Sequence, residues 1–498
     1  MSFGPPPSIY TQSAVTAEDQ RRKRRRKRLW GLLAVPVVAA LVVAGLALRD
    51  GKPDQRDDKP VASGQGRLDV RETVEKPPAS TVGVMGFRFS IDDMSPGEHD
   101  DMPGMWATDK ILAKGIKSTL AGFRIGTDAS PHDEVWRLRL SGLICGYTRH
   151  VTGENRTAVL SRSSDDRHAA CNHVTFVDLD DGQKLWDHVF PLRNSAYDDP
   201  SVTLVHGTVA VTWGKGSDAY DMDSGRRLWR TGATGDCRDT GAAGGRALLF
   251  RVQCLDRKQP ATSWKALVYK VRSVDPRTGR TLWTYAPAAG IRDVRVPSTD
   301  PAVLAVSAGD TEFTELISLD DHGRRRTTIS LRNSFYVGEC MDETDYVVFD
   351  DCQTIPVSDD QVFLRSKEAG GLHNSNWVIG FDLATGNTTR KFESGPNALL
   401  YPLRMSGDKL MALRESDDHI SPSALVSLDP KTGRETPYFY FAVPTEGYTL
   451  ATPDLSDVLV QNGRLFFGAR SADGPADSKQ KRWDWLVLGL ESLAAAKK

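Results

Sequence analysis

The sequence lacks an excess of either charge, since 64 lysines and arginines stand against 65 aspartates and glutamates in 498 residues. This balance, with 39% hydrophobic residues, excludes a disordered polyelectrolyte and a bulk nucleic-acid binder. The sequence also lacks the G-x-S-x-G, H-E-x-x-H and P-loop patterns of common hydrolases, metalloproteases and nucleotide-binding enzymes. We therefore expect no nucleic-acid partner and identify no catalytic residue.

Cysteine is scarce and is absent before Cys145, which excludes a lipid-modified cysteine near the N-terminus. The six cysteines fit an oxidising compartment. Along the sequence the cysteines form three pairs of near neighbours, and in two of these pairs an apolar strand lies between the two cysteines. We therefore expect each cysteine to bond to its neighbour in the sequence. The predicted disulfides are Cys145 with Cys171, Cys237 with Cys254, and Cys340 with Cys352.

Charge is divided unevenly along the chain. Residues 1–28 hold eight consecutive bases and two acids, which leaves 56 bases and 63 acids in the rest. Residues 29–48 are uncharged and mainly apolar, and as a helix they would span roughly 30 Å, the thickness of a bilayer core. The positive-inside rule keeps the bases cytoplasmic and exports the remainder. We expect a basic cytoplasmic tail and an uncleaved transmembrane signal-anchor helix in the cell membrane, with a cleaved signal peptide as the alternative.

Residues 49–80 are rich in charge, proline and glycine and nearly free of large apolar side chains. We expect a flexible linker with a reach of roughly 30 Å. The extracellular domain is then expected at residues 81–498.

The exported part contains an internal repeat. In three copies of the repeat, an aspartate is followed four residues later by a glycine, and the glycine is followed four residues later by a tryptophan. Weaker copies that lack the tryptophan follow. The glycines recur every 43 to 63 residues, which indicates a propeller rather than a helical solenoid. The three full copies are Asp178, Gly182 and Trp186; Asp221, Gly225 and Trp229; and Asp275, Gly279 and Trp283. The weaker copies are Asp320 with Gly323, Asp382 with Gly386, and Asp429 with Gly433.

The residue types of the repeat are those of a turn between two strands. Asp ends an apolar strand, and its carboxylate can accept hydrogen bonds from the backbone N–H groups of the turn. Gly supplies the positive φ that closes the hairpin. The Leu-Trp pair that follows is expected to face inward, with Trp as an apolar plate between neighbouring blades. We therefore expect these residues to be structural.

The repeat resembles the PQQ-like β-propeller repeat. Its consensus runs from an apolar residue and Asp through two variable residues, Thr and Gly to Lys or Arg, and then, after two further residues, to Trp. Residues 274–283 match it almost without departure, and six copies cover about residues 174–438. The resemblance implies an all-β fold in a bacterial, extracytoplasmic protein. Such repeats occur in quinoprotein dehydrogenases and in cofactor-free propellers such as outer-membrane assembly lipoproteins, so the repeat specifies fold and leaves chemistry open.

Eight candidate strands feed turns of this kind. The last, at residues 485–490, has no following strand, so the ring closes only if an N-terminal strand supplies the missing edge. Residues 82–90 have the pattern of such a strand. We predict an eight-bladed propeller, with seven blades as the alternative if the region before Trp136 is an irregular extension.

Metal and cofactor signals are weak. Cys171 lies near two histidines, but a disulfide would occupy its sulfur, and the turns at Asp178 and Asp221 lack the other ligands of a calcium loop. The adjacent cysteine pair of quinoprotein alcohol dehydrogenases is missing. We expect no metal and no cofactor.

The pattern as a whole favours a membrane-anchored binding or scaffold module for a protein or cell-envelope ligand. It contacts the lipid bilayer through one helix. The alternatives are a PQQ-dependent dehydrogenase and a ligand sensor that acts through the cytoplasmic tail.

Overall fold

The computed structural model describes residues 66–91, 94–126, 133–192, 200–260, 266–308, 313–331, 335–338, 340, 348–369, 374–416, 421–475, 477 and 484–496. The chain divides into two compact units, Met1–Pro60 and Val61–Lys498, and all described residues belong to the second. Within these residues no helix is long and apolar enough to cross a membrane. The predicted basic tail and signal-anchor helix lie outside the described residues and stay predictions.

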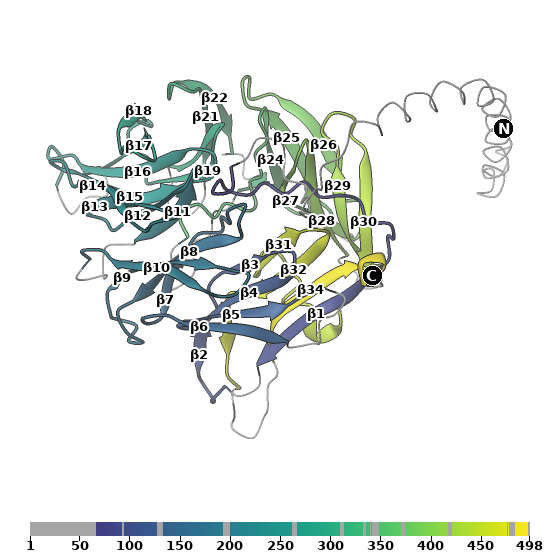
Figure 1. Cartoon of the computed structure of the whole chain (residues 1–498). Helices are drawn as coiled ribbons and strands as arrows, with labels where there is room; N and C mark the ends of the chain where they lie inside the picture. The colour runs from purple at the N-terminus through teal and green to yellow at the C-terminus, as the bar shows by residue number, and fades with distance from the viewer. Residues whose placement is uncertain are drawn as a thin grey trace, which may run out of the picture. The chain divides into compact units, whose positions relative to one another are not determined.

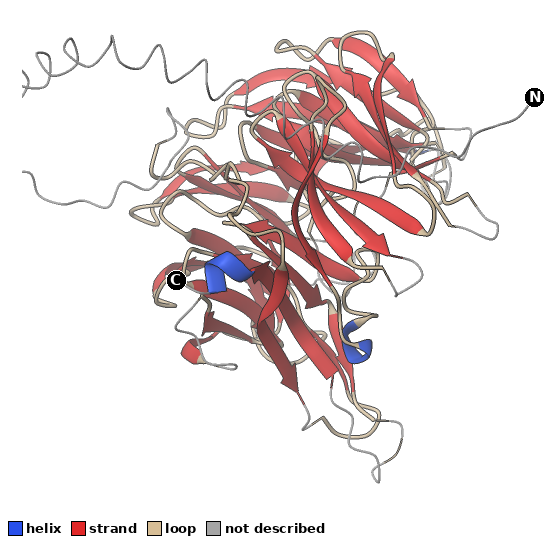
Figure 2. Cartoon of the chain, turned by 90° about the vertical axis from the view of Figure 1, so that its right-hand side faces the viewer, coloured by secondary structure: helices blue, strands red, loops and turns tan. Residues whose placement is uncertain are grey.

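The described chain forms eight four-stranded antiparallel sheets, and Figures 1 and 2 show them as blades around a common axis. The eight-bladed propeller is therefore confirmed, and the seven-bladed alternative is wrong. The first four blades are blade 1 (β3, Met105–Ala107; β4, Ile111–Ile116; β5, Thr119–Arg124; β6, Glu134–Arg139), blade 2 (β7, Ile144–Tyr147; β8, Arg156–Arg162; β9, Cys171–Asp178; β10, Lys184–Val189), blade 3 (β11, Ser201–Val205; β12, Thr208–Thr212; β13, Gly216–Asp221; β14, Arg227–Gly232) and blade 4 (β15, Cys237–Ala243; β16, Leu248–Leu255; β17, Leu267–Val274; β18, Thr281–Tyr285).

Blades 5 to 7 have the same strand order, in which four consecutive strands form the sheet, and blade 8 takes its fourth strand from the N-terminal part of the chain. They are blade 5 (β19, Asp293–Thr299; β20, Ala302–Ser307; β21, Glu315–Leu319; β22, Arg325–Ser330), blade 6 (β23, Tyr336–Val337; β24, Gln361–Ser366; β25, Trp377–Asp382; β26, Thr388–Glu393), blade 7 (β27, Ala398–Ser406; β28, Lys409–Ser416; β29, Ser423–Leu428; β30, Glu435–Phe441) and blade 8 (β31, Ser456–Gln461; β32, Arg464–Ala469; β34, Asp484–Ser492; β1, Gly83–Ile91). Outside the blades, β2 (His99–Asp101) pairs with β33 (Ser471–Asp473), and the described helices are the short η2 (Thr445–Gly447) and α3 (Leu493–Ala496).

The two ends of the propeller meet in blade 8. Strand β1, purple in Figure 1, pairs antiparallel with β34, in yellow, so that Ser90 lies opposite Trp485. The N-terminal strand therefore supplies the fourth strand of blade 8, as the sequence predicts. The closed ring leaves no blade incomplete.

Burial follows the order of strands within a blade. The first three strands of blade 3 are almost entirely buried, whereas the fourth alternates exposed and half-buried residues. The first strand therefore lies innermost and the fourth outermost. Sheets pack on one another through apolar clusters that each join neighbouring blades, such as the cluster containing Phe176 and Tyr220 from blades 2 and 3.

Consecutive strand connections alternate between the two ends of the propeller. We name the end with the connections from first to second and from third to fourth strands the turn face, and the end with the remaining connections the loop face. The repeat motifs lie on the turn face, because each joins the third strand of a blade to the fourth.

The predicted flexible linker is wrong for residues 66–80. This segment, which we call the strap, is described and lies against the turn face, and Glu75 within it is only 6% exposed. Its high content of charge and proline suggested solvation, but its charged side chains are paired with groups of several blades. Residues 49–65 lie outside the described residues.

Candidate functional site

The repeat motifs form capped turns. The Asp275 carboxylate accepts hydrogen bonds from the backbone N–H groups of Arg277 and Thr278 at 3.0 and 2.9 Å, and from the Thr278 hydroxyl at 2.9 Å. The N–H of Thr278 lowers the pKa of this carboxyl. Gly279 closes the turn with a φ of 73° and donates its N–H to the Asp275 carbonyl at 2.9 Å. The motif carboxylate is thus occupied by its own turn.

The other motif residues repeat this arrangement. Each aspartate accepts hydrogen bonds from its own turn, and each glycine has a positive φ between 66° and 76°. The residues concerned are Asp178 with Gly182, Asp221 with Gly225, Asp382 with Gly386, and Asp429 with Gly433.

The motif tryptophans join neighbouring blades. Trp186 of blade 2 lies against the turn of blade 3, where a Cβ on Gly225 would fall 2.7 Å from its ring, and its indole N–H donates to the Met222 carbonyl at 2.9 Å. Trp229 likewise donates to Pro276 of blade 4 at 2.9 Å. A side chain at the turn glycine would displace the ring, so the glycine and the preceding blade's tryptophan form one unit.

Two more members of this series appear in the structure. Trp283 lies over Gly323 of blade 5, and Trp136 of blade 1 lies over Gly182 of blade 2. Sequence analysis missed Trp136 as a motif residue because the long connection after β5 replaces the Asp-x-x-x-Gly spacing before it. Its distance of two residues from the start of β6, as in Trp186 and Trp229, is the signal that could have identified it.

The expected inward Leu-Trp pair is wrong in one respect. Leu282 is 53% exposed, and the tryptophans are half-buried rather than enclosed, because they lie on outermost strands. The reason is that only one face of the fourth strand meets the next blade.

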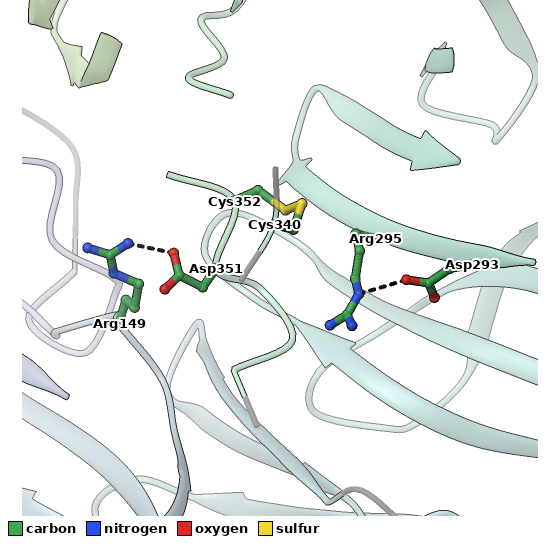
Figure 3. Close-up of a disulfide and its surroundings, with 6 residues drawn as sticks. All are labelled: Arg149, Asp293, Arg295, Cys340, Asp351 and Cys352. Atoms are coloured by element: carbon green, nitrogen blue, oxygen red, sulfur yellow. Dashed lines mark hydrogen bonds and ion pairs between the residues drawn. A yellow bond between two sulfur atoms is a disulfide. The ribbon is translucent and has the colours of Figure 1, made fainter. Parts of the chain in front are cut away.

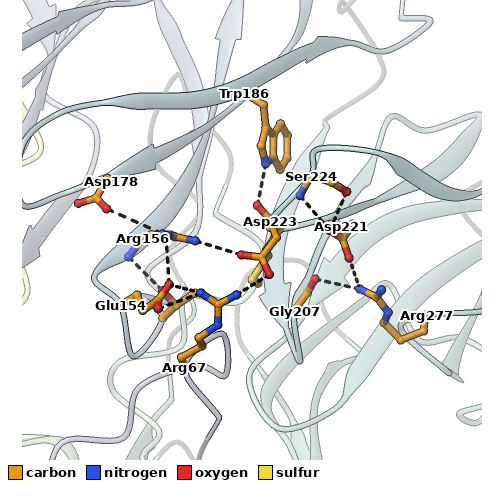
Figure 4. A network of polar contacts seen from close by, with 12 residues as sticks. Arg67, Glu154, Arg156, Asp178, Trp186, Gly207, Asp221, Asp223, Ser224 and Arg277 are labelled. Carbon is orange, nitrogen blue, oxygen red and sulfur yellow. Dashed lines mark hydrogen bonds and ion pairs between the residues drawn. The ribbon is translucent and has the colours of Figure 1, made fainter.

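The strap joins blades across the turn face, as Figure 4 shows for its first residues. Arg67 forms ion pairs with Glu154 of blade 2 at 3.1 Å and with Asp223 of blade 3 at 2.8 Å. Arg156 also contacts Asp223, at 3.4 Å. These pairs are partly solvated, so each contributes little stability and mainly positions the strap.

The strap is anchored more deeply at Glu75. Its carboxylate accepts hydrogen bonds from the Asn462 and Gly463 backbone N–H groups of blade 8, at 3.0 and 2.6 Å, and pairs with Arg404 of blade 7. Tyr438 donates its hydroxyl to the Glu75 carbonyl at 2.9 Å, and burial raises the pKa of this tyrosine to about 12. Because both the backbone and the side chain of Glu75 are held, the strap ties blade 7 to blade 8.

The three predicted disulfides are formed. They are Cys145–Cys171, Cys237–Cys254 and Cys340–Cys352. The first two connect strands within blades 2 and 4. The third closes a segment of blade 6 that leaves the sheet.

Residues 348–352, which we call the plug, lie at the centre of the ring. Tyr336 pairs with Ser366 at one end of β24 and Val357 bridges to Val362 at the other, while the plug between them belongs to no strand. Figure 3 shows the plug beside its disulfide, with Arg149 of blade 2 and Arg295 of blade 5 approaching from different sides. Contacts from so many blades require a position on the axis.

Three plug side chains have partners on blades 2 to 5. Phe349 is 2% exposed, and the guanidinium carbons of Arg251 and Arg295 lie 4.8 and 5.4 Å from its ring centroid. Asp350 accepts a hydrogen bond from Thr203 at 2.7 Å and lies 3.3 Å from His150.

Asp351 is the third plug side chain with a partner outside the plug. It pairs with Arg149 at 2.5 Å and is only 2% exposed. Burial raises its pKa to about 6, although Arg149 opposes the shift. One oxygen of each plug carboxylate, Oδ1 of Asp350 and Oδ2 of Asp351, is buried without a hydrogen-bond partner. The axis is therefore polar as well as filled.

A quinone cofactor at the axis does not fit these residues. Phe349 and the two plug aspartates occupy the centre of the ring, and the sequence has no adjacent cysteine pair. Across the part of the chain that the structure describes, no group of three or more His, Cys, Asp or Glu residues could hold a metal ion.

Residues 269–483 match the sequence profile of a PQQ-repeat family described as outer membrane protein assembly factor BamB. The chain thus carries PQQ-like β-propeller repeats, and the predicted resemblance is confirmed. No curated protein sequence matches the chain.

Several solved structures are similar at low identity. BamB from Moraxella catarrhalis is 12% identical, covering 80% of this chain and 99% of that one, with a TM-score of 0.42. The quinohemoprotein alcohol dehydrogenase ADHIIG from Pseudomonas putida HK5 is 12% identical, covering 86% and 79%, with a TM-score of 0.47. A europium-containing methanol dehydrogenase is 11% identical, covering 84% and 95%, with a TM-score of 0.42. At these values none of the three assigns a ligand or partner to this chain.

Proposed function

We propose that this propeller is an extracytoplasmic binding or scaffold module for a protein or cell-envelope ligand, anchored in the membrane by residues 29–48. The observation that carries the proposal is the plug. A propeller enzyme of the quinoprotein type needs its axis for the cofactor, whereas here Phe349 and its neighbours fill that position with protein side chains. The alternative of a PQQ-dependent dehydrogenase is accordingly not favoured.

The position of the strap indicates which of the two faces is available to bind a partner. It covers turns of blades 2 and 3 through Arg67 and of blades 7 and 8 through Glu75, so much of the turn face is already engaged by the chain itself. The loop face carries the blade-to-blade connections, and connections on a rigid scaffold are the usual location of binding residues. We therefore assign partner binding to the loop face.

Site-specific photocrosslinking in the native cells tests this assignment. A photoreactive amino acid at His168 or Ala288, both exposed on the loop face, is expected to capture a defined partner. The matched positions Asp181 and Lys431, exposed on the turn face, serve as controls. Equal capture from both faces, or capture from the turn face alone, would contradict the assignment.

A cofactor titration tests the alternative. Purified protein mixed with PQQ and calcium is expected to bind no quinone, as followed by the absorbance of the protein fraction after gel filtration. Stoichiometric quinone absorbance in that fraction would favour the dehydrogenase instead.

A further inference from the structure

The plug is attached to the propeller through its side chains. None of residues 348–352 lies in a β-ladder, and the backbone hydrogen bond among them is a local turn from the Asp351 N–H to the Val348 carbonyl at 3.3 Å. The strands and connections around the axis therefore contact the plug through side chains, as a receptor contacts a short bound peptide.

The groups that receive the plug are positioned by other parts of the propeller. Arg251 donates to Asp293 at 2.5 Å and to the Thr240 hydroxyl at 3.0 Å, and Arg295 donates to Asp293 at 3.0 Å. These bonds hold the two guanidinium groups independently of Phe349. A site whose charged groups are already oriented loses less conformational entropy on binding.

Arg149 is positioned in the same way. It donates to the Val458 carbonyl of blade 8 at 3.3 Å as well as to Asp351. Thr203 belongs to β11, so its hydroxyl is fixed by a central strand. The receiving groups for the aromatic ring and for both carboxylates are thus all supported from outside the plug.

We propose that the side chains around the plug form a binding site for a short acidic peptide with an aromatic residue before two carboxylates, and that residues 348–352 occupy this site as an internal ligand. Arg251 and Arg295 receive the aromatic ring, His150 and Thr203 the first carboxylate, and Arg149 the second. This inference deepens the proposed binding function, because it names one ligand class for the module.

The Cys340–Cys352 disulfide gives the internal ligand its advantage. It closes a loop of 12 residues in sequence separation and keeps the plug beside its site, so a free peptide competes against a high effective concentration. The chain also returns to blade 6 at Val357, which bridges Val362, so without the disulfide the plug keeps this short tether on its C-terminal side and has a longer, looser one on its N-terminal side.

The test measures binding of a fluorescent peptide, Val-Phe-Asp-Asp-Ser, to the full-length protein in detergent by fluorescence anisotropy. The Cys340→Ser/Cys352→Ser variant is expected to bind it at least tenfold more tightly than the wild type. The matched control, Cys237→Ser/Cys254→Ser, removes a disulfide that does not hold the plug and is expected to bind like the wild type. Equal binding by both double variants would overturn the proposal.

Two further probes define the chemistry. A Val-Phe-Asn-Asn-Ser peptide is expected to bind at least tenfold more weakly, and a Val-Trp-Glu-Glu-Ser peptide within about tenfold of the original. Arg149→Ala in the Cys340→Ser/Cys352→Ser background is expected to weaken the Asp-Asp peptide about tenfold and the Asn-Asn peptide hardly at all. Binding that ignores the carboxylates would contradict the assignment.

A second variant keeps the test decisive if the loss of the disulfide unfolds the protein. Replacing Phe349, Asp350 and Asp351 together with alanine leaves all three disulfides intact and removes the internal side chains, and this variant is also expected to bind the peptide. If neither folded variant binds, the peptide site is refuted. Photocrosslinking from His168 would still report a loop-face partner, so the two proposals can fail separately.

Discussion

The ring is closed in two different ways in its two halves. From blade 1 to blade 5, each junction places a tryptophan of one blade over the turn glycine of the next. From blade 5 onward the same position holds Thr327, which contacts Gly386, and then Arg390, whose side chain lies 3.3 Å from a Cβ built on Gly433 and donates to the Pro430 carbonyl. The architecture is retained, but the apolar wedge is lost.

Segments outside the repeat motifs join the blades of the second half. The plug, which leaves blade 6, contacts residues of blades 2 to 5, and Glu75 of the strap ties blade 7 to blade 8. The comparison shows that a propeller junction needs a defined contact, and that a local wedge or a distant segment can supply it.

The largest effect is expected at the strap. Replacing the buried Glu75 with alanine leaves the half-buried Arg404 and the N–H groups of Asn462 and Gly463 without their shared partner, and we expect a loss of about 3 kcal/mol, at the lower end of the range for breaking a buried ion pair. Denaturant unfolding of the variant beside the wild type measures it. The control Glu72→Ala removes the half-exposed pair with Arg246 and is expected to cost less than about 1 kcal/mol. Similar losses in both variants would contradict the strap's role in the second half.

A pH-dependent effect follows at the plug. Burial raises the pKa of Asp351 to about 6, above its unfolded value near 3.9, so the folded state holds this proton more tightly. That contribution is fully present below about pH 4 and is lost as the pH rises through 6. The stability of wild type relative to Asp351→Asn is expected to fall by up to about 3 kcal/mol between pH 4 and 7.

Asp293 is expected to give the opposite change of stability with pH, and it serves as the control. Although burial opposes it, Arg251 and Arg295 hold the pKa of this carboxyl below its usual value. Stability relative to Asp293→Asn is therefore expected to be present above about pH 4 and to fall at more acidic pH. Parallel profiles for the two variants would show that the plug carboxyl is not the titrating group.

In the first half, Trp186→Ala is expected to destabilise the protein by about 2 kcal/mol. A fully buried tryptophan would cost about 3–5 kcal/mol, but this ring is half-buried. The change should also remove the hydrogen bond to Met222. Chemical denaturation under oxidising conditions measures it, and an unchanged midpoint would defeat the wedge interpretation.

The smallest effect is expected at the corresponding position of the second half. Arg390→Ala removes an amphipathic stem over Gly433 and two partly solvated hydrogen bonds, of 3.3 Å to the Pro430 carbonyl and 3.0 Å to the Lys431 carbonyl, so a loss of about 1 kcal/mol is expected. If this loss equalled that of Trp186→Ala, the two halves would not differ as we describe.

Much of this fold could be predicted because its signals are local. The Asp-Gly-Trp spacing, the eight candidate strands and the pairing of nearby cysteines each depend on residues close in sequence. The strap and the plug depend on distant partners instead. Nothing near Glu75 reveals that Arg404 will enclose it, and the polar composition of residues 66–80 favours solvent when read alone.

The candidate site could not be predicted from the sequence, because it also depends on residues that are distant in the chain. Residues 348–352 end the stretch between Cys340 and Cys352, and the apolar residues of that stretch favour an ordinary strand. Only the tertiary structure shows that Phe349 leaves the sheet to meet Arg251 and Arg295. Sequence alone predicted the covalent closure at Cys340 and Cys352 but not what it encloses.

The shared blade sets the order of assembly. Strand β1 is synthesised first among the blade strands, yet its partner β34 is last, and Ser90 reaches Trp485 only after all intervening blades have been made. During synthesis, blades 1 to 7 can each form from strands that are close in sequence. Strand β1 stays unpaired until β34 has been made. Completion of the ring is therefore a late, long-range event, and a truncated chain that ends before residue 484 is expected to expose β1 to aggregation or to a chaperone.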